Sequence, residues 1–270
     1  FGAPAVGVRG QVERVDQALH LLVLAHQQVG PPQRLKHDVH RQDAEEQQGA
    51  ALASREHGTK VLVRRARYLG RIRMDTQAAK AYILLKLREE LPDRRTYHSL
   101  EHTLDVYAAV IDIAAQEGVE GEDLQLLKTA ALYHDAGFTE QDLNHEDGSC
   151  AIARRVLPGF GYDPVQVERV CTMIQATRIP HRPEDDLSRI LCDADLDYLG
   201  RSDFERIGSL LFAELRAYGV LSTELEWNRI QVRFLEEHRF FTATNQRDRD
   251  PLKAEHLVAL RRWLAAHDPA

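Results

Sequence analysis

Four short segments place metal-ligating side chains inside otherwise apolar, helix-patterned sequence. The segments are YHSLEH (97–102), ALYHD (131–135), NHE (144–146) and LCDADLD (191–197). Imidazoles and carboxylates together form a ligand set for a divalent transition metal. Burial of carboxylates such as Asp193 and Asp195 in an apolar helix is costly unless they are paired or bind a metal. A metal bound there would lower the pKa of its water and could neutralise the charge of a phosphoryl group, so the four segments predict a metal site that activates water.

The order of these residues resembles the signature of the HD superfamily of metal-dependent phosphohydrolases, a histidine followed by a His-Asp pair and a later aspartate. YHSLEHTLDV resembles the family's first-histidine segment, ALYHDAGF its His-Asp segment and ILCDADLDYLG its final aspartate segment. NHEDGSCAIARRVL resembles a helix often found between them. The resemblance covers about residues 80–220 and implies an all-α fold and hydrolysis at phosphorus.

The same resemblance implies a ligand set for the metal, namely His102, His134, Asp135 and Asp195. Asp195 is preferred because an apolar residue typically follows the family's aspartate, and Asp193 is the alternative ligand. The implied cofactor is a divalent ion (Mn, Fe, Mg, Co, Ni or Zn), and the sequence does not decide which. Family members with two metals have a further histidine near the position of residues 175–177, where this chain has none. That difference favours a single metal.

The catalytic residues implied by the resemblance are Asp135, His98 and Glu146. Asp135 would orient or deprotonate the attacking water, and His98 resembles the general acid of cyclic-nucleotide phosphodiesterases. The alternative for His98 is a histidine at a helix start that bonds to solvent or backbone. Glu146 is a candidate for a second metal or for a phosphate contact. Members that cleave nucleoside monophosphates often have a glutamate at the position of Phe138, so that mechanism is not implied here.

The expected substrate is a small-molecule phosphomonoester or phosphodiester, nucleotide-like by the same resemblance. Candidate substrate-binding residues lie close to the motifs: His145, Arg178, His181 and Arg201. The alternative function is a non-catalytic nucleotide-sensing or scaffold domain that keeps the metal cage, but the four intact ligands favour an enzyme. An HD-type oxygenase would need a second iron and more ligand histidines than the sequence offers.

Helical periodicity of apolar residues continues from residue 74 to the end of the chain. It predicts helices over 78–91, 100–116, 122–135, 146–156, 163–176, 187–199, 203–218, 224–240 and 251–266. Asp163 and Pro164 form a cap and a first-turn proline. No strand-like alternation of useful length occurs. The predicted fold class is therefore all-α, a multi-helix HD-domain bundle.

The first 73 residues differ in composition from the rest of the chain. They contain twelve basic and seven acidic residues, whereas the remainder carries a charge of −12, and only two of the 18 aromatic residues lie among them. We therefore expect residues 1–73 to be a poorly ordered extension and residues 74–270 to form the HD domain with C-terminal helices. Met74 is the first methionine, and the sequence pattern suggests it as the native start.

The whole chain has 270 residues, a formal net charge of −7 and a pI of about 6.0. This charge argues against a general binder of nucleic acid or of anionic membranes. No stretch reaches the ~18–20 apolar residues that span a bilayer, and no signal peptide is recognised, which predicts a cytoplasmic protein. Three widely spaced cysteines suggest neither a disulfide framework nor a zinc site. The oligomeric state is not determined by these features.

Overall fold

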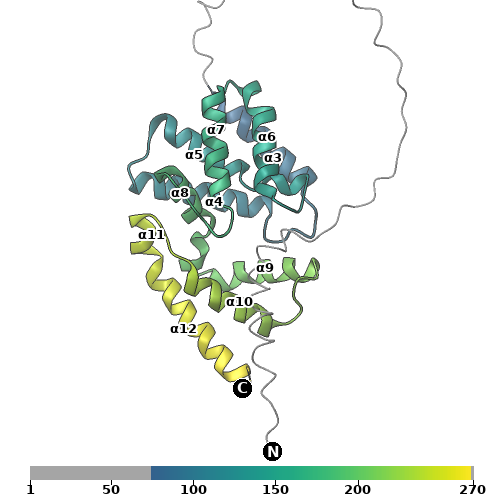
Figure 1. The fold of residues 1–270 in the computed structure, drawn as a ribbon, viewed down its shortest axis with the longest axis vertical. Helices are drawn as coiled ribbons and strands as arrows, with labels where there is room; N and C mark the ends of the chain where they lie inside the picture. Colours follow the sequence, from purple (N-terminus) through teal and green to yellow (C-terminus); the bar gives the residue numbers. More distant parts are fainter. Residues whose placement is uncertain (1–73, 269–270) are drawn as a thin grey trace, which may run out of the picture. The chain divides into compact units, whose positions relative to one another are not determined.

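The computed structural model describes residues 74–268, so the predictions made for residues 1–73 lie outside the described part of the chain. Within that range the chain forms helices and no strand (Figure 1). The α-helices are α3 (Thr76–Glu90), α4 (Leu100–Gln116), α5 (Gly121–Tyr133), α6 (His145–Val156), α7 (Pro164–Ala176), α8 (Asp186–Asp195), α9 (Phe204–Ala217), α10 (Glu224–Glu237), α11 (Ala243–Asp248) and α12 (Asp250–His267). Short 3-10 helices are η1 (Ala136–Thr139), η2 (Leu157–Phe160) and η3 (Asp197–Gly200). The predicted all-α fold class is confirmed.

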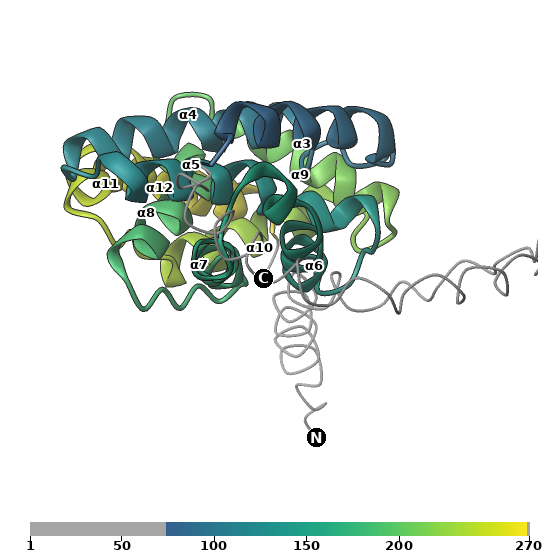
Figure 2. The same ribbon diagram turned by 90° about the horizontal axis from the view of Figure 1, so that it is seen from above.

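Helix α5 is the central element of the bundle made by α3 to α8, and it packs against α3, α4, α6, α7 and α8 (Figure 2). Its second half is buried almost all round, including Leu126, Leu127 and Tyr133. Such a helix carries little amphipathic character, because partners cover every face. The residues that follow its last turn, His134 and Asp135, are thereby delivered to the middle of the bundle.

Capping side chains determine where several helices begin. Asp163 and Gln166 form a capping box at the start of α7, with Pro164 in the first turn, as the sequence predicts. Ser99 caps α4 and accepts a hydrogen bond from the backbone N–H of His102. His98 therefore precedes α4, as the helix predicted over 100–116 requires.

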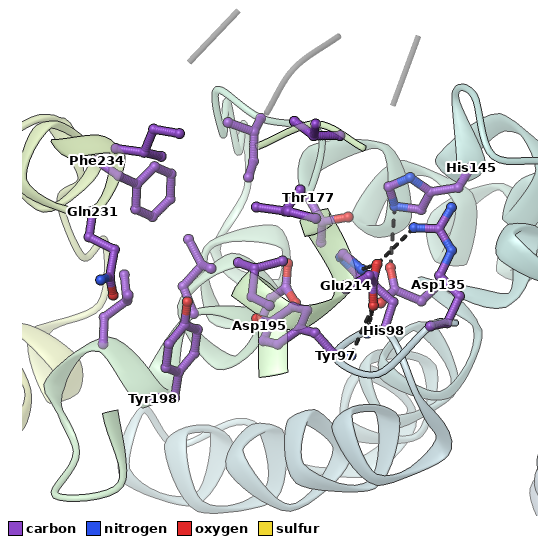
Figure 3. A pocket seen from close by; sticks show the side chains of 18 of the residues that line it. Tyr97, His98, Asp135, His145, Thr177, Asp195, Tyr198, Glu214, Gln231 and Phe234 are labelled. Carbon is purple, nitrogen blue, oxygen red and sulfur yellow. Dashed lines mark hydrogen bonds and ion pairs between the residues drawn. The ribbon is translucent and has the colours of Figure 1, made fainter. Parts of the chain in front are cut away.

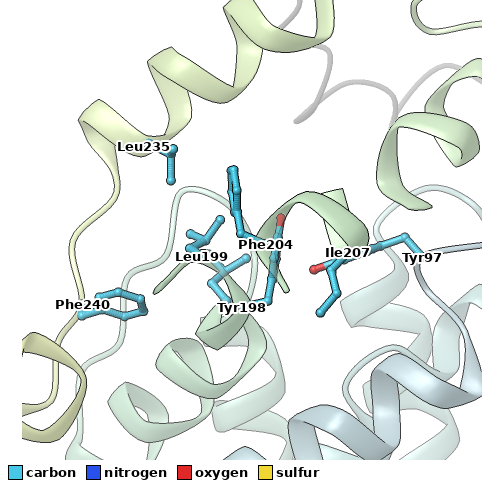
Figure 4. Close-up of a cluster of buried hydrophobic side chains, with 8 residues drawn as sticks. Tyr97, Tyr198, Leu199, Phe204, Ile207, Leu235 and Phe240 are labelled. Carbon is cyan, nitrogen blue, oxygen red and sulfur yellow. The ribbon is translucent and has the colours of Figure 1, made fainter. Parts of the chain in front are cut away.

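The C-terminal helices pack on the bundle through η3. Helix α12 contacts both α10 and η3, and a cluster of buried side chains connects these elements with the segment before α4 (Figure 4). Its members are Tyr97, Leu196, Tyr198, Leu199, Phe204, Ile207, Leu235 and Phe240. The cluster joins residues more than 100 positions apart, so it fixes the C-terminal helices against the wall that carries the motif histidines.

Two predicted helices are shorter than their apolar patterns. The helix expected over 187–199 is divided into α8 and η3, because buried Asp197 turns toward the side chains of Arg249 and Asn245, 2.7 and 3.2 Å away. The helix expected over 224–240 ends at Glu237, where Lys253 donates to the carbonyl of His238. Both endings depend on partners from α11 and α12, which local periodicity does not contain.

Among the described residues, no helix combines the length and the apolar character needed to cross a membrane.

Candidate metal centre

Three of the predicted ligands converge at the centre of the bundle. The Nε2 atoms of His102 and His134 lie 3.1 and 3.4 Å from Oδ1 of Asp195 and 3.4 Å from each other. The three ligand atoms lie within 4.8 Å of one another, and among the described residues these three side chains form the one such group. Two imidazoles and a carboxylate at these distances can surround a divalent ion.

The fourth predicted ligand, Asp135, completes this cluster. Its Oδ2 lies 3.2 Å from Nε2 of His134 and 3.4 Å from Nε2 of His102. That oxygen is buried without a hydrogen-bond partner, which is costly for a carboxylate unless something else satisfies it. An orphaned buried oxygen beside two imidazoles is what a metal ligand requires, so the residues present fit a divalent cation.

Backbone contacts orient the His-Asp turn. Nδ1 of His134 donates to the carbonyl of Ala131 at 2.8 Å, which directs Nε2 into the cluster. The Ser149 hydroxyl donates to the His134 carbonyl at 2.6 Å and accepts from the N–H of Gly137 at 2.8 Å. A Cβ on Gly137 would overlap the carbonyl of His145. The glycine therefore allows α6 to lie directly on η1, and this contact brings His145 to the site.

The electrostatics of the cluster couple its four groups. Burial disfavours the charged form of His102, but the nearby carboxylates of Asp135 and Asp195 together outweigh burial and raise its pKa to about 9. The pKa of His134 is also raised, because Asp135 and Asp195 together outweigh the burial penalty. The pKa of Asp195 is lowered by the same two histidines against the effect of burial. A cation that enters the cluster must therefore displace protons from the imidazoles.

His98 lies beside the cluster and is held by a buried carboxylate. Its Nδ1 donates to Oε1 of Glu214 at 2.6 Å, and the backbone N–H groups of Tyr97 and His98 donate to Oε2 of the same side chain. Arg95 donates to Oε1 from the other side at 2.8 Å. Despite burial, the charges of His98 and Arg95 lower the pKa of Glu214, which stays ionised. Glu214 thus determines the ring orientation of His98.

The residues at the start of α6 form a polar wall of the site. Asn144 adopts a left-handed backbone conformation (φ 49°), which asparagine tolerates, and the chain then turns into α6. His145 stacks on Phe138 with ring centroids 4.0 Å apart and places Nε2 3.2 Å from Oδ1 of Asp135. Buried Glu146 contacts the partly exposed guanidinium of Arg178 at 3.4 Å. These side chains line one pocket together with His98, Asp135 and Asp195 (Figure 3).

The structure places three other candidates away from this pocket wall. Asp193, the alternative ligand, accepts hydrogen bonds from the backbone of Phe241 and Thr242 and from the Thr242 hydroxyl, all within 3.1 Å. His181 is buried behind Asp195, 4.0 Å from its Oδ2. Arg201 pairs with the carboxylates of Asp105, Asp197 and Asp203 and lines a different pocket. A direct substrate contact is therefore not supported for His181 or Arg201.

Sequence reasoning missed two residues of the site, Glu214 and Arg95. Glu214 lies 116 residues after His98, but the residue pattern around it could have indicated a buried acid. It follows Ile207 by seven positions and Leu211 by three, so it is an acid on the apolar face of α9. Arg95 stacks over the ring of Phe138, 3.9 Å from its centroid. Its neighbourhood, DRRTYHS, reads as an ordinary charged loop and offers no comparable signal.

The match to a family model agrees with the signature found in the sequence. Residues 99–197 match the family model of the HD domain. Among solved structures, the chain is similar to a predicted HD superfamily hydrolase from an uncultured Thermotogales bacterium, with 24% sequence identity and a TM-score of 0.48. That similarity covers 69% of this chain and 91% of the other. A search of curated proteins found no match.

Proposed function

We propose that the protein, whose residues 99–197 match the family model of the HD domain, is a metal-dependent phosphohydrolase that cleaves a phosphomonoester or phosphodiester. The proposal rests on the buried cluster of His102, His134, Asp135 and Asp195, in which one carboxylate oxygen has no hydrogen bond. This cluster opens onto a pocket with a candidate proton donor and a guanidinium at its wall. A nucleotide-like substrate, which the sequence resemblance implies, stays a prediction.

The four clustered side chains would hold the metal. A divalent cation bound there supplies activation of water and neutralisation of charge on the phosphoryl oxygens. Asp135, whose Oδ1 faces the pocket near His145, is the group positioned to orient the attacking water and to accept its proton. Arg178, partly exposed at the mouth, is placed to bind a phosphoryl oxygen.

His98 is the candidate donor of the proton that the leaving group needs. In the reaction the water oxygen forms a bond to phosphorus, the ester P–O bond breaks, and the departing oxygen takes a proton from His98. Glu214 accepts the hydrogen bond from Nδ1, so the opposite ring nitrogen is the one that serves the substrate. A proton donor of this kind contributes about 10²–10⁴-fold to the rate.

Metal analysis combined with a panel of phosphomonoesters and phosphodiesters tests the proposal. We expect bound metal, turnover of at least one ester and loss of turnover on chelation. Asp135→Asn should abolish turnover, whereas Asp123→Asn is the matched control, because Asp123 is exposed and pairs with Arg169 on the surface. If the metal-loaded protein hydrolyses nothing, the proposal is wrong. Binding of a nucleotide without turnover would then favour the sensing domain.

A further inference from the structure

The pocket at the metal centre continues into a second region made by η3, α9 and α10. We call this region the apolar arm and define it by Leu199, Phe204, Leu211, Ile230, Phe234 and Leu235. Figure 3 shows Phe234 and Gln231 at one end, His145 at the other, and Asp195 between them. The arm is therefore continuous with the cluster that would hold the metal.

The wall of the arm carries little polarity. Helix α10 is rich in charged residues, yet those of its side chains that line the pocket follow a helical spacing of three and four: Trp227, Ile230, Gln231, Phe234 and Leu235. Among the described residues, α10 contributes no charged side chain to the pocket. The amide of Gln231 is already engaged, since its Nε2 donates to Oδ1 of Asn228 at 2.8 Å.

The two tyrosines between the arm and the metal centre also offer no charge. The rings of Tyr97 and Tyr198 pack edge to face, with their centroids 5.8 Å apart. A phenol is uncharged near pH 7, and both rings are buried. They present rings rather than ions to the space between Asp195 and Phe234 (Figure 3).

The size of the pocket limits what the arm can hold. The cavity volume of the whole pocket, with the metal end included, is about 140 Å³, so the arm alone is smaller than the ~150 Å³ engineered apolar cavity that binds benzene. A group of about one six-membered ring is therefore the upper limit for the arm, whereas a nucleoside is larger. A nucleobase would also bury several donors and acceptors against a wall where Gln231 is the main polar group, and each unpaired group costs free energy.

We propose that the phosphate ester cleaved at this site carries an apolar group about the size of one six-membered ring, which the arm receives while the phosphoryl group lies at the metal cluster. This inference rests on the proposed phosphohydrolase function and names its substrate class. It departs from the nucleotide-like substrate that the sequence resemblance implies.

Three esters of primary alcohols test the inference, because their leaving groups are similar and their organic parts differ. On the metal-loaded protein, we expect kcat/KM for benzyl phosphate to exceed that for ethyl phosphate by about 30-fold, the worth of burying one ring. Adenosine 5′-monophosphate should be no better than ethyl phosphate. Equal values for benzyl and ethyl phosphate, or a preference for the nucleotide, would overturn the inference.

A substitution that fills the arm with a larger side chain gives a second test. Leu211→Trp adds bulk inside the arm, and Leu210→Trp is the matched control, since Leu210 is exposed on the same helix and does not line the pocket. Leu211→Trp should lower the benzyl-to-ethyl ratio at least tenfold, and circular dichroism of the variant checks that it is folded. A ratio unchanged by Leu211→Trp would contradict the arm.

Binding of inert analogues separates failure of this inference from failure of the proposed function. Benzylphosphonate should bind the metal-loaded protein at least tenfold more tightly than ethylphosphonate, and Leu211→Trp should remove the difference. If no ester is turned over but this difference holds, the arm stands and the phosphohydrolase proposal fails. If esters are turned over but the analogues bind equally, the phosphohydrolase stands and the arm is wrong.

Discussion

The two ends of the pocket bury different kinds of side chain. At the metal end, charged groups are buried close together, and each depends on a partner, as His98 depends on Glu214. At the other end, the apolar arm buries rings and aliphatic side chains such as Phe204 and Ile230 that need only contact and exclusion of water. A displacement of about 1 Å at the metal end should therefore lower activity strongly. A substitution in the arm should weaken binding in proportion to the volume and area that it changes.

The largest effect should follow removal of a metal ligand. Asp195→Asn should remove most of the bound metal and lower turnover at least 1,000-fold, because a catalytic metal contributes several kcal/mol. Asp193→Asn should keep its metal, because Asp193 bonds to the backbone after α10 instead. Metal content and circular dichroism of both variants check this. Loss of metal from Asp193→Asn with retention in Asp195→Asn would reverse the ligand assignment.

A smaller effect should follow loss of the group that orients His98. Glu214→Gln should lower kcat about 100-fold for esters with poor leaving groups and leave KM nearly unchanged. The loss should shrink for 4-nitrophenyl phosphate, whose leaving group needs little protonation. Steady-state kinetics on both ester types provide the measurement. An equal loss on both types would mean that Glu214 acts on structure rather than through His98.

The arm should give a weaker and more selective effect. Phe234→Ala removes a half-buried ring from the arm and should raise KM for benzyl phosphate about tenfold, with little change for ethyl phosphate. Comparison of the two KM values in one preparation is the measurement. A similar rise for both esters would show that Phe234 supports the fold and not the binding of an apolar group.

The free energy of unfolding should depend on pH through Glu214 at the metal end. Because the folded-state pKa of Glu214 is lowered from 4.5, its contribution is fully present above that value and is lost as pH falls toward the lowered pKa. Glu214→Gln should cost about 3 kcal/mol at pH 7, and the cost should diminish below pH 4.5. Denaturant unfolding at several pH values measures it. A constant difference down to pH 3 would contradict the shift.

Local patterns account for what the sequence predicted well. Apolar periodicity places α4 over Leu100–Gln116, and the Asp163-Pro164 signal places the start of α7, because caps and periodic burial depend on neighbours within a few residues. The HD signature likewise consists of short segments, each readable alone, and Asp135 lies beside His134 in one of them.

The sequence by itself determined the all-α class and the family to which residues 99–197 match, because both depend on local spacing of residue types. Only the tertiary structure separated Asp195 from Asp193, two positions apart, since their side chains point to different partners. It also joined Glu214 to His98 and α10 to the metal cluster. Such contacts arise from packing between distant helices, and no window of sequence contains both partners.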